Sequence, residues 1–402
     1  MKTTRRHDID ALRVLLFCSL ILYHACMLYV AEWPWHLKSS YQSEWLQVPM
    51  LLINRWRMPL LFLISGIAVS FLERNLAGWS LVGNRTRRIL VPLVFGMLVI
   101  VPIQPYVEGV MRHAVEPGFG PFLVDYFTFR PWPKDAFAGA HPGITWNHLW
   151  YLAYLWLYSL MVIAAMPLLR SRVGTFVRER VAGLRGGWLL LVPALPKAIA
   201  LMTLGDAFPM TNALTDDWYQ HALFFSYFLF GWWIASDTGL WIEIRSLRKR
   251  ALGLATFNAI AYVLIIQVLL TDDSPPWMLF ATRALSGLNT WLCILTVLGW
   301  SATLLDRPFR WLPYATEAVL PWYVLHQSLI VAVAYVLVPM KIGAALEPVV
   351  VIASTALACV VLHEFVIRRS GAMRFLFGLK PLPASTGQVH RDSLTGRRRY
   401  TS

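Results

Sequence analysis

Ten long apolar segments separated by polar loops limit what this 402-residue chain can fold into. Most of them approach the roughly 20 residues with which a helix crosses the hydrocarbon core of a bilayer. Because that core offers no water to the backbone, such segments must be helical. The sequence therefore predicts an all-α, polytopic integral membrane bundle of about ten transmembrane helices. The predicted spans are residues 9–31, 52–73, 89–108, 146–168, 187–205, 218–237, 251–271, 277–305, 317–339 and 345–367.

Composition supports a membrane protein and excludes several other classes. Hydrophobic residues make up 57% of the chain and charged residues only 14%, which is too apolar for a soluble enzyme of this length. The net charge of +14 comes mostly from loops between spans, so we predict no nucleic-acid partner. The four cysteines lie in apolar segments and are expected to be free thiols. No Cys-x-x-Cys pair or close His/Asp/Glu cluster occurs, so no metal site is predicted.

Loop charges predict the orientation of the bundle. Lys and Arg gather in every second loop, whereas the loops at 206–217 and 272–276 contain neither. Basic loops stay in the cytoplasm, so both termini are predicted to be cytoplasmic. The basic loops, with four, five, four and two Lys or Arg, are 74–88, 169–186, 238–250 and 306–316.

Two further segments define the domain organisation. The loop at 109–145, rich in proline and aromatic residues, is too short for a separate domain and is expected to cap an outward-facing cavity. Residues 1–383 are predicted to form one transmembrane domain. Residues 384–402 are predicted to be a basic, disordered cytoplasmic tail. The fifth span contains Pro193, Pro196 and Lys197, so we expect it to be kinked or partly re-entrant.

The first span carries two ionisable residues, Arg13 and His24. Eleven residues are about three helical turns, so both side chains fall on one face, roughly 16 Å apart along the axis. Ionisable groups at such depth usually mark a functional path. His24 fits a general base, or alternatively a hydrogen bond between helices. Arg13 fits a phosphate or carboxylate ligand, or a snorkelling residue held by Asp10.

Five short motifs follow one another along the spans. They are Arg13 and His24 separated by ten residues, RMPLLFLISG at 57–66, Arg85-x-x-Arg88-x-x-x-Pro92, HLWYL at 148–152 and YVLH at 323–326. Together with the ten-span layout, they resemble the acyltransferase family 3 membrane proteins. The second and fourth motifs and the ending FLFGLKP at 375–381 are most similar to the succinyltransferases of osmoregulated periplasmic glucans within that family.

The resemblance implies an acyl-CoA-dependent O-acyltransferase in the bacterial inner membrane. Such an enzyme moves an acyl group, with succinyl as the candidate, from cytoplasmic acyl-CoA to a hydroxyl of a periplasmic glucan or another extracytoplasmic glycan. Its partners would be the donor acyl-CoA, with succinyl-CoA as the candidate, the glycan and membrane lipids. No tightly bound cofactor is expected. Homo-oligomerisation is left open. His24 would act as general base, and a covalent acyl-histidine is the alternative.

The same resemblance assigns roles to the remaining motif residues. Arg85 and Arg88 would bind donor phosphates with Arg13, or serve as positive-inside anchors. His326 and Tyr323 would join His24 in catalysis, Tyr323 by donating to an oxyanion or orienting an imidazole; a polar helix contact is the alternative.

Three residues near the outer ends of their spans are candidates for binding the acceptor. Arg57 would bind an anionic or hydroxylated group, or snorkel. His148 and Trp150 would contact the glycan, with Trp150 stacking on a sugar ring or belonging to the aromatic belt. Arg283 and Glu364 are assigned structural pairing roles. A transporter or translocator without acyl-transfer chemistry, and a noncatalytic sensor, are the alternative functions.

Overall fold

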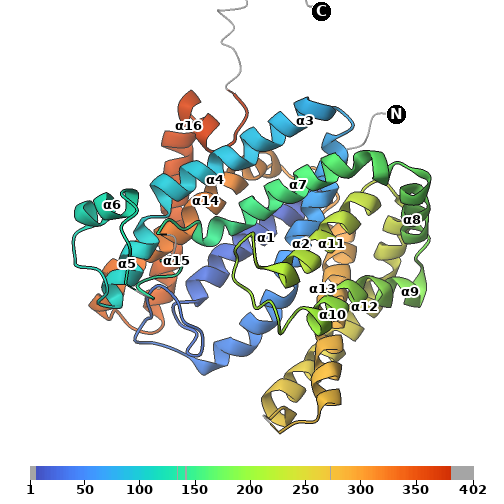
Figure 1. Ribbon diagram of the computed structural model, residues 1–402, viewed down its shortest axis with the longest axis horizontal. Coiled ribbons are helices and arrows are strands. Elements are labelled where there is room, and N and C mark those ends of the chain that lie inside the picture. Colours follow the sequence, from blue (N-terminus) through green and yellow to red (C-terminus); the bar gives the residue numbers. More distant parts are fainter. Residues whose placement is uncertain (1–5, 134, 141–142, 272, 382–402) are drawn as a thin grey trace, which may run out of the picture.

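The computed structural model describes residues 6–133, 135–140, 143–271 and 273–381 (Figure 1). Within these residues the secondary structure consists of helices joined by loops and contains no strand, apart from one isolated bridge between Val30 and Ser43. The all-α fold is therefore confirmed. The predicted tail at 384–402 lies outside the described residues.

Eight described helical segments are long and apolar enough to cross a membrane. A ninth would be the bent pair 78–100 and 103–111, whose two parts meet at 40°. Helix α11 (Trp218–Ile234), which matches the remaining predicted span, has only 17 residues. A polytopic helical membrane protein is thus confirmed, while the count of ten and the cytoplasmic termini stay predictions. The eight segments are His7–Cys26, Glu44–Leu72, Asn147–Leu169, Gly186–Thr203, Thr238–Leu269, Pro276–Leu304, Leu312–Met340 and Leu346–Ile367.

The long α-helices in these segments are α1 (His7–Cys26), α2 (Gln47–Leu72), α7 (Trp150–Leu169), α12 (Thr238–Leu264), α13 (Pro276–Leu304), α14 (Leu312–Leu337) and α15 (Leu346–Val361). The shorter ones are α3 (Gly78–Arg85), α4 (Val91–Phe95), α5 (Ile103–Met111), α6 (Phe119–Phe127), α8 (Arg172–Ala182), α9 (Gly186–Leu191), α10 (Leu195–Thr203) and α16 (Gly371–Leu376). Figure 1 shows α1, α2, α7 and α14 near the middle of the bundle, with α12 and α13 as a hairpin that projects downward.

Helix α1 ends at Cys26, five residues before the predicted end of the first span. The following residues fold back: the amides of Ser39 and Ser43 donate to the carbonyls of Leu28 and Tyr29 at 3.0 and 2.7 Å. The Lys38 ammonium donates to carbonyls beyond the helix end, including that of Met27 at 2.8 Å. The last carbonyls of α1 itself accept from the amides of residues 27–30, so Lys38 stabilises the turn that follows the helix. Burial lowers the pKa of Lys38. His24 consequently lies in the last turn of α1.

Helices α2 and α11 pack with their backbones in close contact. A Cβ added to Gly66 would lie 1.9 Å from the carbonyl oxygen of Phe228, and one added to Gly231 would lie 2.0 Å from that of Leu63. Small residues permit such close approach of membrane helices. This contact fixes the rotation of α2 and thereby the direction in which its cavity-facing side chains point.

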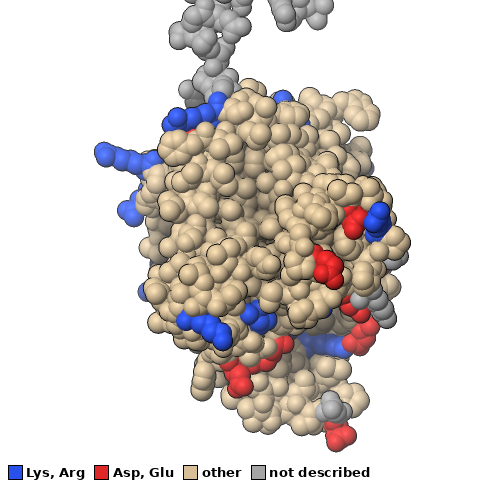
Figure 2. Space-filling view, turned by 90° about the vertical axis from the view of Figure 1, so that its left-hand side faces the viewer, with Lys and Arg blue, Asp and Glu red and all other residues tan. Residues whose placement is uncertain are grey.

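In the fifth span a 3-10 turn at Val192–Ala194 separates α9 from α10 at the prolines where a kink is expected, and the kink itself stays a prediction. The expected pairings also occur: Arg283 contacts Asp206, and Arg368 lies 3.1 Å from Glu364. Figure 2 shows a face that is mostly free of charged side chains, as expected for a surface in contact with lipid. In its upper third the visible charged residues are almost all Lys and Arg, whereas most acidic ones lie in the lower half.

Candidate active site

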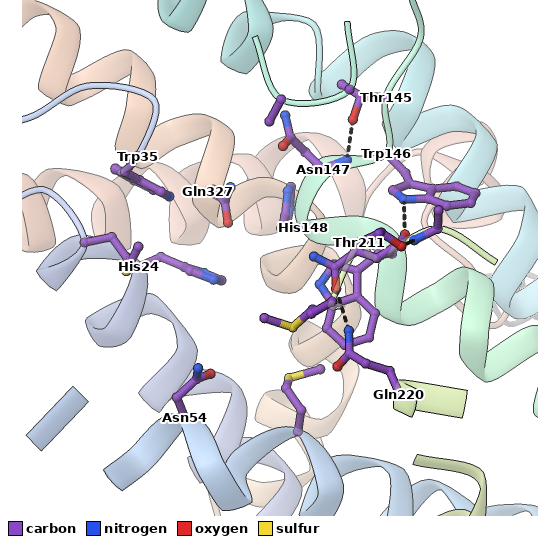
Figure 3. Close-up of a pocket in the computed structure, with 18 of the residues that line it drawn as sticks. His24, Trp35, Asn54, Thr145, Trp146, Asn147, His148, Thr211, Gln220 and Gln327 are labelled. Atoms are coloured by element: carbon purple, nitrogen blue, oxygen red, sulfur yellow. Dashed lines mark hydrogen bonds between the residues drawn. The ribbon is translucent and has the colours of Figure 1, made fainter. Parts of the chain in front are cut away.

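A cavity of about 1750 Å³ lies where the end of α1 meets α2 and the loops at 27–43, 128–147 and 204–217. This volume exceeds that of ordinary small-molecule pockets, so a large ligand fits. His24, Trp35, Trp146, His148 and other lining side chains are shown in Figure 3. Residues of the loop that was expected to form a cap, among them Thr145 and Gly139, form part of the wall.

His24 and His326 are in direct contact at the edge of this cavity. Nδ1 of His24 lies 2.8 Å from Nε2 of His326, and the rings stack with centroids 5.0 Å apart. Nδ1 of His326 faces the backbone carbonyls of Tyr323 at 2.7 Å and Trp322 at 3.2 Å. Helices α1 and α14 thus bring together two residues that lie 302 positions apart in the sequence.

The partners of His326 determine where the protons of this pair reside. Carbonyl oxygens only accept, so Nδ1 of His326 must carry a proton. In the neutral ring Nε2 is then an acceptor, and Nδ1 of His24 must donate to it. The remaining nitrogen of a neutral His24, Nε2, keeps a free lone pair, and it has no hydrogen-bond partner among the described residues. Because the His24 ring borders the cavity (Figure 3), this nitrogen can accept a proton from a ligand.

His148 lies beside the pair, with its ring centroid 5.2 Å from that of His326. Its Nε2 is 3.2 Å from the carbonyls of Tyr323 and Val324, and its Nδ1 is 3.2 Å from the amide of Gln104. Both nitrogens are therefore held by protein groups. The Tyr323 hydroxyl donates to the His148 carbonyl, so it is the Tyr323 backbone that orients the His326 imidazole. The predicted catalytic role of the hydroxyl stays a prediction.

A buried chain of polar residues, not identified from the sequence, continues from His148. The Gln327 amide donates to Gln104 at 2.9 Å and contacts Nε2 of His36 at 3.1 Å. Nδ1 of His36 lies 2.5 Å from Glu108. Glu108 also pairs with Arg112 at 2.7 Å and accepts the amide of Ala138 at 3.0 Å. Glutamine within apolar spans was the available sequence signal, because buried polar groups in membranes need partners.

Arg57, on α2, is buried, with 4% of its surface exposed, and lines the same cavity. Its guanidinium carbon lies 3.6 Å from the centroid of the Tyr23 ring, a cation–π contact. Its Nε and Nη1 atoms have no hydrogen-bond partner in the part of the chain that the structure describes. The snorkelling alternative is therefore wrong, since the side chain points into the protein.

Trp150 also lines the cavity and packs against Phe224, with ring centroids 5.6 Å apart, and Tyr154, at 5.2 Å. This packing fixes the indole at the cavity wall. Its stacking on a sugar stays a prediction.

The other predicted cations form a separate cluster away from the cavity. Arg85 and Arg88 lie close enough to Arg13 for their charges to repel. Arg13 is 3.4 Å from Asp10, Arg85 donates to Ser159 at 3.1 and 3.2 Å, and Arg88 donates to the Gly378 carbonyl at 3.4 Å. None of the three guanidinium groups lines the cavity that holds His24.

Aromatic rings occupy the region between the two sites. Phe17 follows Arg13 by one turn of α1 and precedes His24 by two turns. Its ring centroid lies 5.3 Å from that of Tyr323 and 6.3 Å from that of Tyr151, and the two tyrosine rings are 5.9 Å apart. The face shared by Arg13 and His24 is therefore closed by packed rings.

Comparison with known proteins adds independent information. The model of the acyltransferase domain family, acyltransferase 3, matches residues 6–364. Glucans biosynthesis protein C from Escherichia coli K12 and from Shigella dysenteriae serotype 1 is 24% identical over 174 residues. This match covers 42% of the chain and 41% of each relative, so the chain aligns with about two fifths of their length. No solved structure matches.

Proposed function

Because this chain belongs to the acyltransferase family 3, a family of membrane acyltransferases, we propose that it transfers an acyl group from acyl-CoA to a hydroxyl of an extracytoplasmic glycan. The observation that carries the proposal is the His24–His326 pair, which leaves one imidazole nitrogen free at the cavity wall. The acyl group is proposed to be succinyl and the acceptor a periplasmic glucan. The resemblance of the motifs and the name of the glucan biosynthesis relatives support these finer assignments.

In the proposed reaction, Nε2 of His24 takes the proton of the sugar hydroxyl while that oxygen attacks the thioester carbonyl. The tetrahedral intermediate then collapses: the C–S bond breaks and the CoA sulfur takes the proton from the imidazolium. During this step the Nδ1–H of His24 keeps donating to His326, which its contacts with backbone carbonyls hold in place. A covalent acyl-histidine would use the same Nε2 atom.

The cavity wall supports a glycan as the acceptor. Tryptophan rings offer flat apolar faces for the C–H surface of a sugar, and amide and hydroxyl groups offer partners for its hydroxyls. Both kinds of group are present here, and the volume of about 1750 Å³ accommodates several sugar rings. The tryptophans that line the cavity are Trp33, Trp35, Trp146 and Trp150, and the amide side chains that line it are Asn54, Asn147, Asn212, Gln220 and Gln327.

The donor is proposed to bind from the opposite side. Arg13, Arg85 and Arg88 present three positive charges that fit the phosphates of CoA. To reach His24, the thioester arm must pass the rings of Phe17, Tyr151 and Tyr323, so the proposal requires these rings to separate when donor binds.

The test uses purified full-length protein with succinyl-CoA radiolabelled in its acyl group and a neutral β-glucan oligosaccharide. Label should move to the oligosaccharide, and His24→Ala should abolish transfer while donor binding persists. His113→Ala, at an exposed histidine that is not among the residues lining the cavity, is the matched control. If label never leaves CoA, while the protein moves oligosaccharide across vesicle membranes in a His24-dependent way, the transporter alternative replaces this proposal.

A further inference from the structure

Arg57 is a buried cation that forms no ion pair with any carboxylate in the described part of the chain. With 4% exposure its charge is removed from water, yet Nε and Nη1 make no hydrogen bond. Among the described residues no carboxylate forms an ion pair with it, and the Tyr23 ring covers one face of the guanidinium. A buried charge is unfavourable unless it is paired. The geometry therefore indicates that a ligand supplies the counter-charge.

The surrounding charges specify that this ligand is an anion. Arg55 and Lys197 line the same cavity, and Lys197 is buried and donates to Thr290 at 2.6 Å. Two carboxylates also line the cavity: Glu108, which His36 and Arg112 already hold, and Asp216, an exposed residue that accepts a hydrogen bond from Thr215. Neither forms an ion pair with Arg57 among the described residues. The part of the wall around Arg57 thus has an excess of positive charge.

The position of Arg57 indicates which part of the donor it would bind, the acyl group or the phosphates. Tyr23, on which Arg57 stacks, directly precedes His24 in α1, and the Tyr23 and His24 rings are 5.8 Å apart. The phosphates have their own cluster of cations on the far side of the Phe17 contact. An anion bound by Arg57 would therefore lie beside His24 and so near the reacting carbonyl.

We propose that Arg57 binds the free carboxylate of a dicarboxylic acyl group, so that this enzyme selects a thioester whose acyl chain ends in a carboxylate. A planar guanidinium matches a carboxylate in geometry and charge. This assignment rests on the proposed acyl transfer. It makes Arg57 a residue that determines donor specificity, in place of the acceptor-binding role that its sequence position indicated.

The experiment compares two donors of equal chain length, succinyl-CoA and uncharged butyryl-CoA, with the same neutral oligosaccharide. Wild-type protein should prefer succinyl-CoA. In Arg57→Met the ratio of the two kcat/KM values should fall on the order of 10- to 100-fold, the size expected when a hydrogen bond between charged groups is lost. Arg57→Lys keeps the charge but lacks the planar guanidinium. Its ratio of the two kcat/KM values should lie between those of the wild type and Arg57→Met. Arg55→Met removes a charge from the same wall and should change the ratio less.

Several results would overturn the assignment. These are a wild-type enzyme that transfers butyryl as well as succinyl, an equal loss of both donors in Arg57→Met, and an equal fall of the ratio in Arg55→Met. The acceptor's charge is tested with a carboxylated oligosaccharide. If the loss of kcat/KM in Arg57→Met depends on whether the acceptor carries this carboxylate, Arg57 binds the acceptor and the assignment is overturned as well.

The two proposals can fail separately. Transfer of butyryl without transfer of succinyl refutes the role of Arg57 and leaves the acyltransferase intact. Absence of transfer from every donor refutes the proposed function and this assignment with it. If Arg57→Met does not fold, as judged by its elution and unfolding temperature in detergent, Arg57→Lys carries the comparison. The binding of both donors to the His24→Ala protein then provides a second measurement.

Discussion

Replacing His326 tests whether it holds His24 in the reactive tautomer. In His326→Leu the Nδ1–H of His24 loses its acceptor, which lies 2.8 Å away. His24 becomes positively charged as it takes the proton, so the lost hydrogen bond is one to a charged group and is worth about 1.5–3 kcal/mol. That energy corresponds to a decrease of kcat by roughly 10- to 150-fold. Because the bond strengthens only as charge develops, KM for the donor should change little.

His326→Gln is the matched variant, because its side-chain oxygen can accept the Nδ1–H of His24. It should recover much of the activity that His326→Leu loses. Initial rates with labelled acyl-CoA give kcat and KM, and the unfolding temperature in detergent shows whether each variant is folded. Full activity in His326→Leu, or an equal loss in both variants, would refute the argument that His326 acts by accepting this proton.

Three further predictions concern the donor site, the polar chain and the packing of the bundle. Arg13→Ala should weaken acyl-CoA binding by about 1.5–3 kcal/mol in equilibrium binding, and unchanged affinity would give Arg13 a structural role only. Glu108→Gln removes the charge that faces His36 and Arg112, and it should lower the unfolding temperature; an unaltered temperature would contradict the pairing. Gly66→Ala should reduce the yield of folded protein, because the new Cβ meets a carbonyl oxygen at 1.9 Å. Gly83→Ala is the control and should leave the yield unchanged, because a Cβ there meets nothing within 4 Å. Equal yields would show that α2 can shift away from α11.

Much of the fold was predictable because lipid restricts the backbone so strongly. Every predicted apolar span corresponds to a helix, to part of one or, at 89–108 and 187–205, to a series of short helices. The end of α1 was not predictable, because it depends on Lys38, which reaches back to carbonyls near the helix end across 11 positions. The apolar residues 27–31 gave no sign of this, since apolarity is equally compatible with a helix and with a buried turn.

The candidate site was only partly predictable. The spacing of Arg13 and His24 indicated a common helix face, and the structure places Phe17 between them, a residue that looks like any lipid-facing aromatic in the sequence. Contact between His24 and His326 requires knowledge of how α1 and α14 rotate against each other, which hydropathy does not contain. The roles of Gln104 and Gln327 depend on the same rotation.

The packed rings of Phe17, Tyr151 and Tyr323 also bear on the permeability of the membrane. In the proposed reaction, a passage wide enough for a pantetheine arm would conduct water and protons if it stood open, and would dissipate any gradient across the membrane. Rings that fill this path before donor binds would act as a seal, and the bound thioester arm would then fill the space in their place. A donor on one side of the membrane could thus react with an acceptor on the other side without an open channel.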